Sequence, residues 1–67
     1  MVFKRNAIQV GDTVRITVEI ETIGGTFTSG HRFRVIGTSD RGYDLEDEFG
    51  NRALEVPREF FEREDSD

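Results

Sequence analysis

Residues 12–21, with the sequence DTVRITVEIE, alternate apolar and polar side chains without a break. The apolar set is Val14, Ile16, Val18 and Ile20. A repeat of two residues is typical of a β-strand with one buried and one solvated face, so we predict a strand here. Ile23 falls out of phase with this set, which predicts a bulge or the end of the strand near Thr22. The pair Gly24 and Gly25 then predicts a turn.

The same period returns after these glycines. Phe27, Phe33 and Val35 occupy positions of one parity, and Arg32 and Arg34 occupy the other. We therefore expect the apolar three to face the core and the two arginines to face solvent. A Ser-Gly pair between the two phenylalanines predicts a turn or kink.

Two shorter strands follow, bounded by the turn sequences TSDRG and EFGN. We expect Tyr43 and Leu45 to face inward in the first of these strands, and Leu54 and Val56 to share a face in the second. The Gly, Asn and Asp residues of the turn sequences suit tight turns. Four or five short strands with regularly spaced turn signals predict a small all-β barrel.

The one proline of the chain, Pro57, comes directly after the last of these strands. Proline cannot donate a hydrogen bond to a strand ladder, and its fixed φ suits a tight 3₁₀ turn. We therefore predict that the strand ends at Pro57 and that a 3₁₀ turn follows. Phe60 and Phe61 are adjacent in sequence, so their side chains point in different directions. We expect one of them to cover the core and the other to lie at the surface.

The chain has 67 residues and no cysteine. This length allows one domain, and its core must be held by apolar packing without disulfides or thiolate metal sites. We place the domain at residues 1–62 and expect the charged tail, residues 63–67, to be disordered. The N-terminal sequence contains no long apolar run, so we expect no membrane segment and a cytoplasmic protein.

The formal net charge of −5 is unevenly distributed. Residues 1–38 carry five cations and three anions, whereas residues 39–67 carry four cations and eleven anions. A net negative charge disfavours binding to bulk nucleic acid or to anionic lipid, because such binding depends on neutralising phosphates with Lys and Arg.

The order of these features resembles the SH3-like barrels. A GDTVRI strand, a long loop and three antiparallel strands lead to a Pro-x-x-aromatic turn at Pro57 and Phe60, and the resemblance covers about residues 8–62. It implies an all-β fold, a small SH3-like barrel of about five antiparallel strands with a 3₁₀ turn before the last strand or tail. An OB-like strand order is the alternative, although no helical segment is evident between the third and fourth strands.

The resemblance also implies a non-enzymatic module that acts through a protein partner. In peptide-binding SH3 domains, the aromatic residue at the place of Phe60 lines a groove for Pro-rich peptides. Those domains also use a tryptophan at the start of a central strand, and this chain has none. The closer resemblance is to small bacterial SH3-like modules, which lack that groove and include accessory subunits and KOW-type modules. We expect a monomer or weak dimer without a cofactor. The candidate protein-binding residues are Phe27, Tyr43, Pro57, Phe60 and Phe61.

A nucleic-acid-associated module, KOW-like or OB-like, is the alternative function. Arg15, Arg32 and Arg34 lie on the outward faces of predicted strands, where they could contact phosphates while an exposed aromatic ring stacks on bases. The plainer interpretation is that these arginines pair with Glu19 and Glu21 across the strand ladder.

The sequence offers no recognisable catalytic or metal-binding motif. His31 is the one histidine of the chain, and no neighbouring residue in the sequence would position it as a general base. No serine stands in a Gly-x-Ser-x-Gly setting. The carboxylates of residues 43–48, YDLEDE, lack the spacing of a calcium-binding loop, so we interpret them as a solvated acidic edge that limits strand aggregation. We therefore expect a protein that is not an enzyme and holds no metal.

Overall fold

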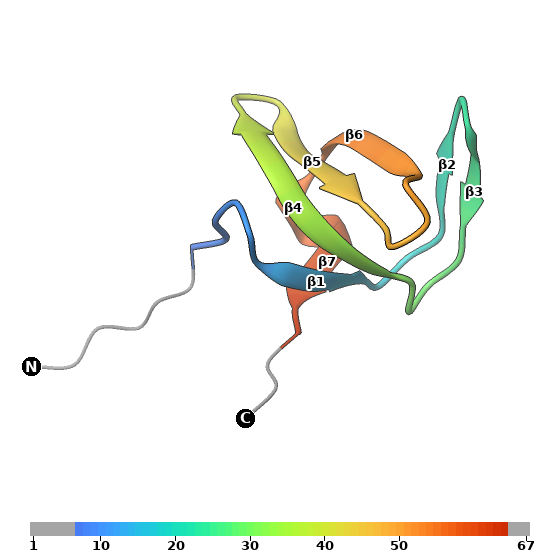
Figure 1. Ribbon diagram of the computed structural model, residues 1–67, viewed down its shortest axis with the longest axis horizontal. Coiled ribbons are helices and arrows are strands. Elements are labelled where there is room, and N and C mark those ends of the chain that lie inside the picture. The colour runs from blue at the N-terminus through green and yellow to red at the C-terminus, as the bar shows by residue number, and fades with distance from the viewer. Residues whose placement is uncertain (1–6, 65–67) are drawn as a thin grey trace, which may run out of the picture.

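The computed structural model describes residues 7–64, and these form seven β-strands and one 3₁₀ turn (Figure 1). The fold is therefore all-β, as the alternating sequence pattern predicts. No helix in the described part of the chain is long and apolar enough to cross a membrane. The elements are β1 (Thr13–Ile16), β2 (Ile20–Thr22), β3 (Gly25–Phe27), β4 (Arg32–Ser39), β5 (Gly42–Glu46), β6 (Arg52–Val56), η1 (Arg58–Phe60) and β7 (Phe61–Arg63).

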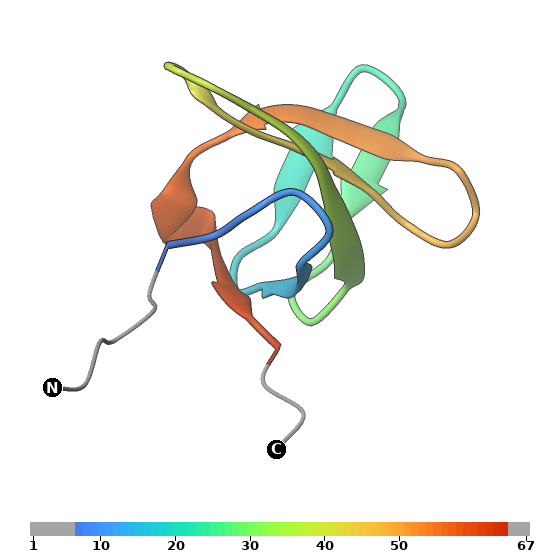
Figure 2. The same cartoon turned by 60° about the vertical axis from the view of Figure 1, so that its left-hand side comes forward.

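Five of the strands form one antiparallel sheet in the order β6-β5-β4-β1-β7. The other two, β2 and β3, form a separate hairpin that extends away from the sheet (Figure 1). The sheet is strongly curved, with β6 toward one end and β1 and β7 toward the other (Figure 2). The five antiparallel strands and the 3₁₀ turn before the last strand are thus confirmed. Because no ladder joins β6 to β7 within residues 7–64, a closed barrel is not detected.

The core lies on the inner side of this curved sheet. Phe33 is its largest fully buried side chain, and the centroid of its ring lies 5.0 Å from that of Phe27 and 4.8 Å from that of His31. Edge-to-face and tilted contacts of this kind are favourable arrangements of aromatic rings. The buried apolar residues are Ile8, Val14, Ile16, Ile20, Phe27, Phe33, Val35, Leu45, Ala53, Val56 and Phe61.

The first strand is shorter than its sequence pattern predicts. β1 ends at Ile16, and the Val18 side chain is 42% exposed although its parity matches the buried set. The Thr17 amide donates a hydrogen bond to the carbonyl of Phe60 at 2.8 Å, so it binds η1 and not a neighbouring strand. The chain then bends away from the sheet and starts the hairpin at Ile20. The alternation of apolar and polar residues cannot reveal this bend, because the bend depends on the contact of Thr17 with η1, which is distant in the sequence.

The expectation that Leu54 and Val56 share a face is wrong. A bulge places Leu54 and Glu55 together opposite Asp44 of β5, which adds one residue to β6 and reverses the parity beyond it. The buried residues of β6 are consequently Ala53 and Val56, and Leu54 is 63% exposed. Glu55 has a positive φ of 56°, and its amide donates to the Asp44 carboxylate at 3.0 Å. That carboxylate therefore stabilises the bulge.

The predicted tail begins too early. β7 continues through Arg63, and the Glu64 amide donates a hydrogen bond to the Thr13 carbonyl at 2.9 Å. Arg63 also donates through Nη2 to the carbonyl of Ala7 at 2.8 Å. The rest of the predicted tail, residues 65–67, lies outside the described residues.

The strained backbone of the bulge predicts the effect of a glycine substitution. Glu55→Gly is expected to stabilise the protein by about 1 kcal/mol, because glycine adopts a positive φ without the steric cost that other residues incur. Glu62→Gly, on the extended backbone of β7, is expected to destabilise it by about 0.5–1 kcal/mol. Urea unfolding of both variants measures the difference. Equal destabilisation by the two changes would contradict the bulge.

Candidate functional site

The 3₁₀ turn places its two phenylalanines in different environments. The Phe60 amide donates to the Pro57 carbonyl at 3.0 Å, which closes η1 directly after β6 as the position of Pro57 predicts. Phe61 begins β7 and is buried, whereas Phe60 is half-buried and packs against the edge of the core. The prediction that the two rings separate is therefore confirmed, with Phe60 the more exposed.

Tyr43 joins these residues from β5. It lies opposite Val56 in the ladder, and its ring meets the Phe61 ring edge-on at a centroid distance of 5.3 Å. Tyr43 and Pro57 are each half-buried, like Phe60. We call the three residues Tyr43, Pro57 and Phe60 the Pro57 surface. Beneath this surface, Tyr43 packs on Phe61, which belongs to the hydrophobic core.

Phe27, the fifth candidate contact residue, lies elsewhere. It is the last residue of β3, is only 8% exposed, and packs on His31 and Phe33. Four of the five candidates are thus brought together at η1, and Phe27 is not among them. Of those four, Phe61 is buried, so the area open to a partner comes from the Pro57 surface.

The arginines expected on the outer face are on β1 and β4. Arg15 and Arg32 are directly opposite each other in the ladder. Both contact the carboxylate of Glu64: Arg15 Nη2 lies 3.2 Å from Oε2, and Arg32 Nε lies 2.8 Å from Oε1. The expected pairing with Glu19 and Glu21 does not form, because the chain leaves the sheet after β1 and carries both glutamates away from β4.

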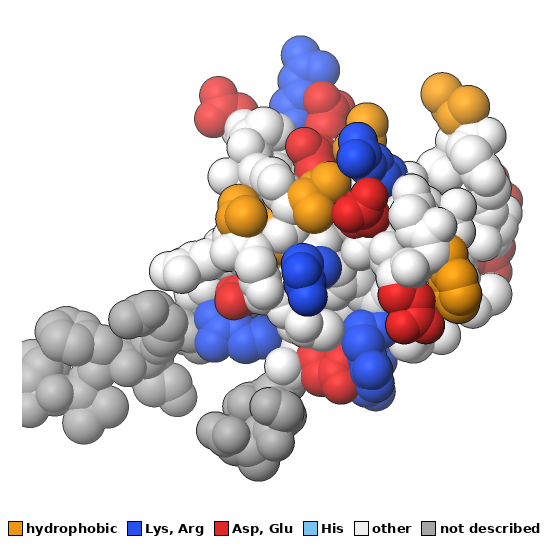
Figure 3. Space-filling view, viewed as in Figure 1, with side chains coloured by type: hydrophobic (Ala, Val, Ile, Leu, Met, Phe, Trp, Pro, Cys, Tyr) orange, Lys and Arg blue, Asp and Glu red, His pale blue; other side chains and the backbone are white. Residues whose placement is uncertain are grey.

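Arg34 is two residues further along β4, on the same outer face. It is exposed and lies opposite Thr13 on one side and Glu46 on the other. The Glu46 carboxylate forms an ion pair with Arg52 Nε at 3.2 Å. Cationic and anionic side chains are accordingly interspersed over this side of the molecule (Figure 3).

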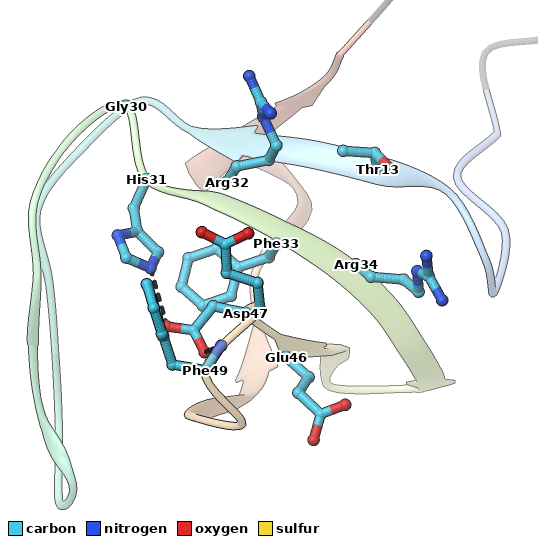
Figure 4. Close-up of a pocket in the computed structure, with 10 residues that line it drawn as sticks. Thr13, Gly30, His31, Arg32, Phe33, Arg34, Glu46, Asp47 and Phe49 are labelled. Atoms are coloured by element: carbon cyan, nitrogen blue, oxygen red, sulfur yellow. Dashed lines mark hydrogen bonds and ion pairs between the residues drawn. The ribbon is translucent and has the colours of Figure 1, made fainter.

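A depression of about 600 Å³ lies beside these arginines, between the start of β4 and the β5–β6 turn (Figure 4). Its most exposed apolar residue is Phe49, at 75%. The depression is lined by Thr13, Gly30, His31, Arg32, Phe33, Arg34, Glu46, Asp47, Glu48 and Phe49.

Asp47 holds the β5–β6 turn in place. Its Oδ1 accepts hydrogen bonds from the amides of Phe49 at 2.9 Å and Asn51 at 2.8 Å. Its Oδ2 accepts a hydrogen bond from Asn51 Nδ2 at 3.1 Å. The same oxygen is 3.0 Å from His31 Nε2 (Figure 4). The last contact connects this turn to the start of β4. Asp47 is therefore a structural carboxylate and not part of a solvated edge.

The environment of Asp47 favours its charged form. Burial acts to raise the pKa of the Asp47 carboxyl, but hydrogen bonds from His31, from Asn51 and from the turn backbone outweigh it. The net effect lowers the pKa from 3.8 to about 2. The carboxylate thus stays ionised to unusually low pH.

Sequence reasoning did not identify Phe49 or the contact between His31 and Asp47 as site features. His31 and Asp47 are sixteen residues apart in the chain, and they come into contact only when β4 and β5 pair. One local signal was present: an Asp before an EFGN turn is well placed to accept backbone hydrogen bonds from that turn. The exposure of Phe49 has no sequence signal of its own.

Comparison with known proteins assigns no family to this chain. It matches no protein-family model, no curated protein and no solved structure. Within residues 7–64, no three His, Asp or Glu side chains converge into a group that could hold a metal ion. The expectations that the protein is not an enzyme and holds no metal remain predictions.

The lowered pKa of Asp47 predicts the pH dependence of an Asp47→Asn variant. Because the folded-state pKa is depressed, the carboxylate stabilises the fold above pH 3.8, and this contribution is lost as the pH falls through about 2. The Asp47→Asn variant lacks this contribution. We therefore expect its free energy of unfolding to be about 2–3 kcal/mol lower than that of the unchanged protein near neutral pH, and this difference should shrink toward low pH. Urea unfolding between about pH 7 and about pH 2 measures this deficit.

Asp40→Asn is the matched control, because Asp40 is exposed in the β4–β5 turn. It is expected to have little effect near neutral pH. A deficit for Asp47→Asn that stays constant over the whole pH range would contradict the proposed role of the buried carboxylate.

Proposed function

We propose that this chain is a small SH3-like module that binds another protein through the Pro57 surface. The observation that carries the proposal is the grouping of three half-buried residues, Tyr43, Pro57 and Phe60, of which Tyr43 and Phe60 pack against the core. Half-buried aromatic residues on a fixed backbone are suited to binding, because little conformational entropy is lost when a partner covers them.

The order of elements supports the SH3-like part of the proposal. A first strand, β1, is followed by a long connection that contains the β2–β3 hairpin, by three antiparallel strands, and by a 3₁₀ turn that leads into β7. Phe60 occupies the place of the groove aromatic in peptide-binding SH3 domains. At the start of β5, where this chain has no tryptophan, it carries Tyr43. The ring of Tyr43 packs edge-on against Phe61.

The β2–β3 hairpin offers a second contact. Ile23 lies at its tip and is fully exposed, next to Gly24 and Gly25. Burying an isoleucine side chain contributes about 1.5–3 kcal/mol, so an apolar residue fixed at the end of a hairpin is a useful contact for a partner. Residues 22–30, which include this tip, are therefore part of the surface that we propose for the partner.

The charges near the Pro57 surface indicate the chemistry of the partner. Glu55 and Glu59 are exposed on β6 and η1. Arg58, also exposed on η1, has its guanidinium carbon 5.1 Å from the centroid of the Phe61 ring. A partner segment with apolar side chains and flanking charges of both signs would complement this arrangement.

A peptide selection tests the proposed function. We expect peptides selected from a random library on the full-length chain to be rich in apolar residues and to carry charges of both signs. In nitrogen-proton NMR titrations they should shift the resonances of Tyr43, Arg58 and Phe60. Phe60→Ala should weaken this binding by about tenfold or more, as expected for an aromatic residue at the centre of an interface.

Phe49→Ala provides the matched control for the peptide experiment. It removes the same side chain from the β5–β6 turn and is expected to leave peptide affinity unchanged. Because Phe60 is half-buried, both variants are first compared by thermal unfolding and then assayed where each is folded. Selected peptides that shift only residues remote from η1, or that bind the Phe60→Ala variant equally well, would overturn the proposal.

A further inference from the structure

The outer face of β1, β4 and β7 holds two arginines that share one internal anion. Arg15 and Arg32 are directly opposite each other in the ladder, where two like charges would repel. The carboxylate of Glu64 relieves this repulsion by contacting both guanidinium groups, at 3.2 and 2.8 Å. Two arginines that converge on one carboxylate form an oxyanion site, because the guanidinium group matches both carboxylate and phosphate oxygens.

Glu64 is well positioned but does not fully satisfy this site. Its backbone is fixed by the hydrogen bond to Thr13, at the end of β7. Its Oε1 is buried and makes no hydrogen bond of good geometry, although Arg32 Nε lies 2.8 Å away. The contact is therefore electrostatic and poorly directed. A phosphate group has more acceptor oxygens and could accept aligned hydrogen bonds from both arginines.

The surroundings of the two arginines extend the site toward Phe49. Arg32 lines the depression of about 600 Å³, together with Arg34 and the exposed Phe49 ring (Figure 4). Arg32 and Arg34 lie at one side of the depression and Phe49 at the other, so a phosphate held at Arg32 and a base stacked on Phe49 would span it (Figure 4). Single-stranded nucleic acid, in which phosphates alternate with planar bases, would complement these side chains. Proteins that bind single strands combine cationic side chains, which contact phosphates, with aromatic rings on which bases stack.

Acidic residues limit the extent of this site. Glu46, Asp47 and Glu48 line the same depression. Glu46 forms an ion pair with Arg52, and the Asp47 carboxylate accepts hydrogen bonds from its own turn. Glu48 has no such partner among residues 7–64, so its charge opposes phosphate binding on that side. The cationic part is thereby confined to β1 and the first half of β4. This arrangement suits a short stretch of single strand and not a long polyanion.

We infer that Arg15, Arg32 and Arg34 form a phosphate site for single-stranded nucleic acid, with Phe49 as the base platform, and that Glu64 occupies the site as a competing internal ligand. The intact chain then binds such strands weakly, in keeping with its net charge of −5. Removal of the Glu64 charge exposes the site. This surface is separate from the proposed protein-binding surface at η1.

Glu64→Gln in the full-length chain tests the inference. Binding of a labelled oligo-dT of about ten nucleotides is measured by fluorescence anisotropy at low salt. We expect binding about three- to tenfold tighter than in the unchanged protein, because two surface ion pairs no longer compete with phosphate. The gain should fall steeply as salt is added, since it depends on phosphate neutralisation.

Glu62→Gln is the matched control. Glu62 lies on β7 opposite Arg15, is exposed, and has the same charge as Glu64 without contacting either arginine within 4.0 Å. This variant reports the general effect of removing one negative charge, so its increase in affinity for the oligonucleotide should be smaller than that of Glu64→Gln. Adding Arg15→Gln or Phe49→Ala to Glu64→Gln should reverse most of the gain, while Phe60→Ala should not.

Three results would overturn the inference. One is an equal gain for Glu64→Gln and Glu62→Gln. Another is a Glu64→Gln protein that binds inorganic phosphate or poly-glutamate as tightly as the oligonucleotide, which would leave no role for bases. If Glu64→Gln fails to fold, the unchanged protein is titrated with excess oligonucleotide, and absence of shifts at the Nε groups of Arg15 and Arg32 would likewise reject it.

Discussion

The pairing of β1 with both β4 and β7 is the constraint on which the other features of this structure depend. β1 has four residues, yet it joins the C-terminal strand to the rest of the sheet and contributes two of the largest fully buried side chains, Val14 and Ile16. Its pairing with β7 fixes η1 and thus the Pro57 surface. Its pairing with β4 brings Arg15 opposite Arg32. Both proposed binding surfaces therefore arise from the contacts of one short strand.

Carboxylates serve different purposes in different parts of this acidic chain. Asp47 is buried, accepts hydrogen bonds from the turn it precedes, and stays ionised because these bonds outweigh the cost of burial. Asp44 stabilises a bulge through one backbone amide, and the Glu64 carboxylate forms ion pairs with two arginines. Other acidic residues, such as Glu59 and Glu62, are simply exposed. Net charge describes none of these roles, since each depends on what lies beside the carboxylate.

The sequence predicts most of the strands and little of the candidate sites. Alternation identifies the buried faces of β1, β4 and β5, and Pro57 identifies the 3₁₀ turn, because these signals are local. The exposure of Leu54 is missed, since a one-residue bulge in β6 follows from its pairing with β5. The pairing of Arg15 and Arg32 with Glu64 is missed for the same kind of reason. These contacts join residues distant in sequence, and a period of two contains no information on which strands become neighbours.

The position of β1 is tested most directly by the nuclear Overhauser contacts of Val14 in the full-length protein. Val14 pairs with Phe33 of β4 and with Arg63 of β7. The account predicts backbone contacts from Val14 to both residues, together with slow exchange of the Thr17 amide, which is bonded to Phe60. Contacts from Val14 to β4 alone would contradict it, because β7, η1 and the carboxylate of Glu64 would then be placed elsewhere.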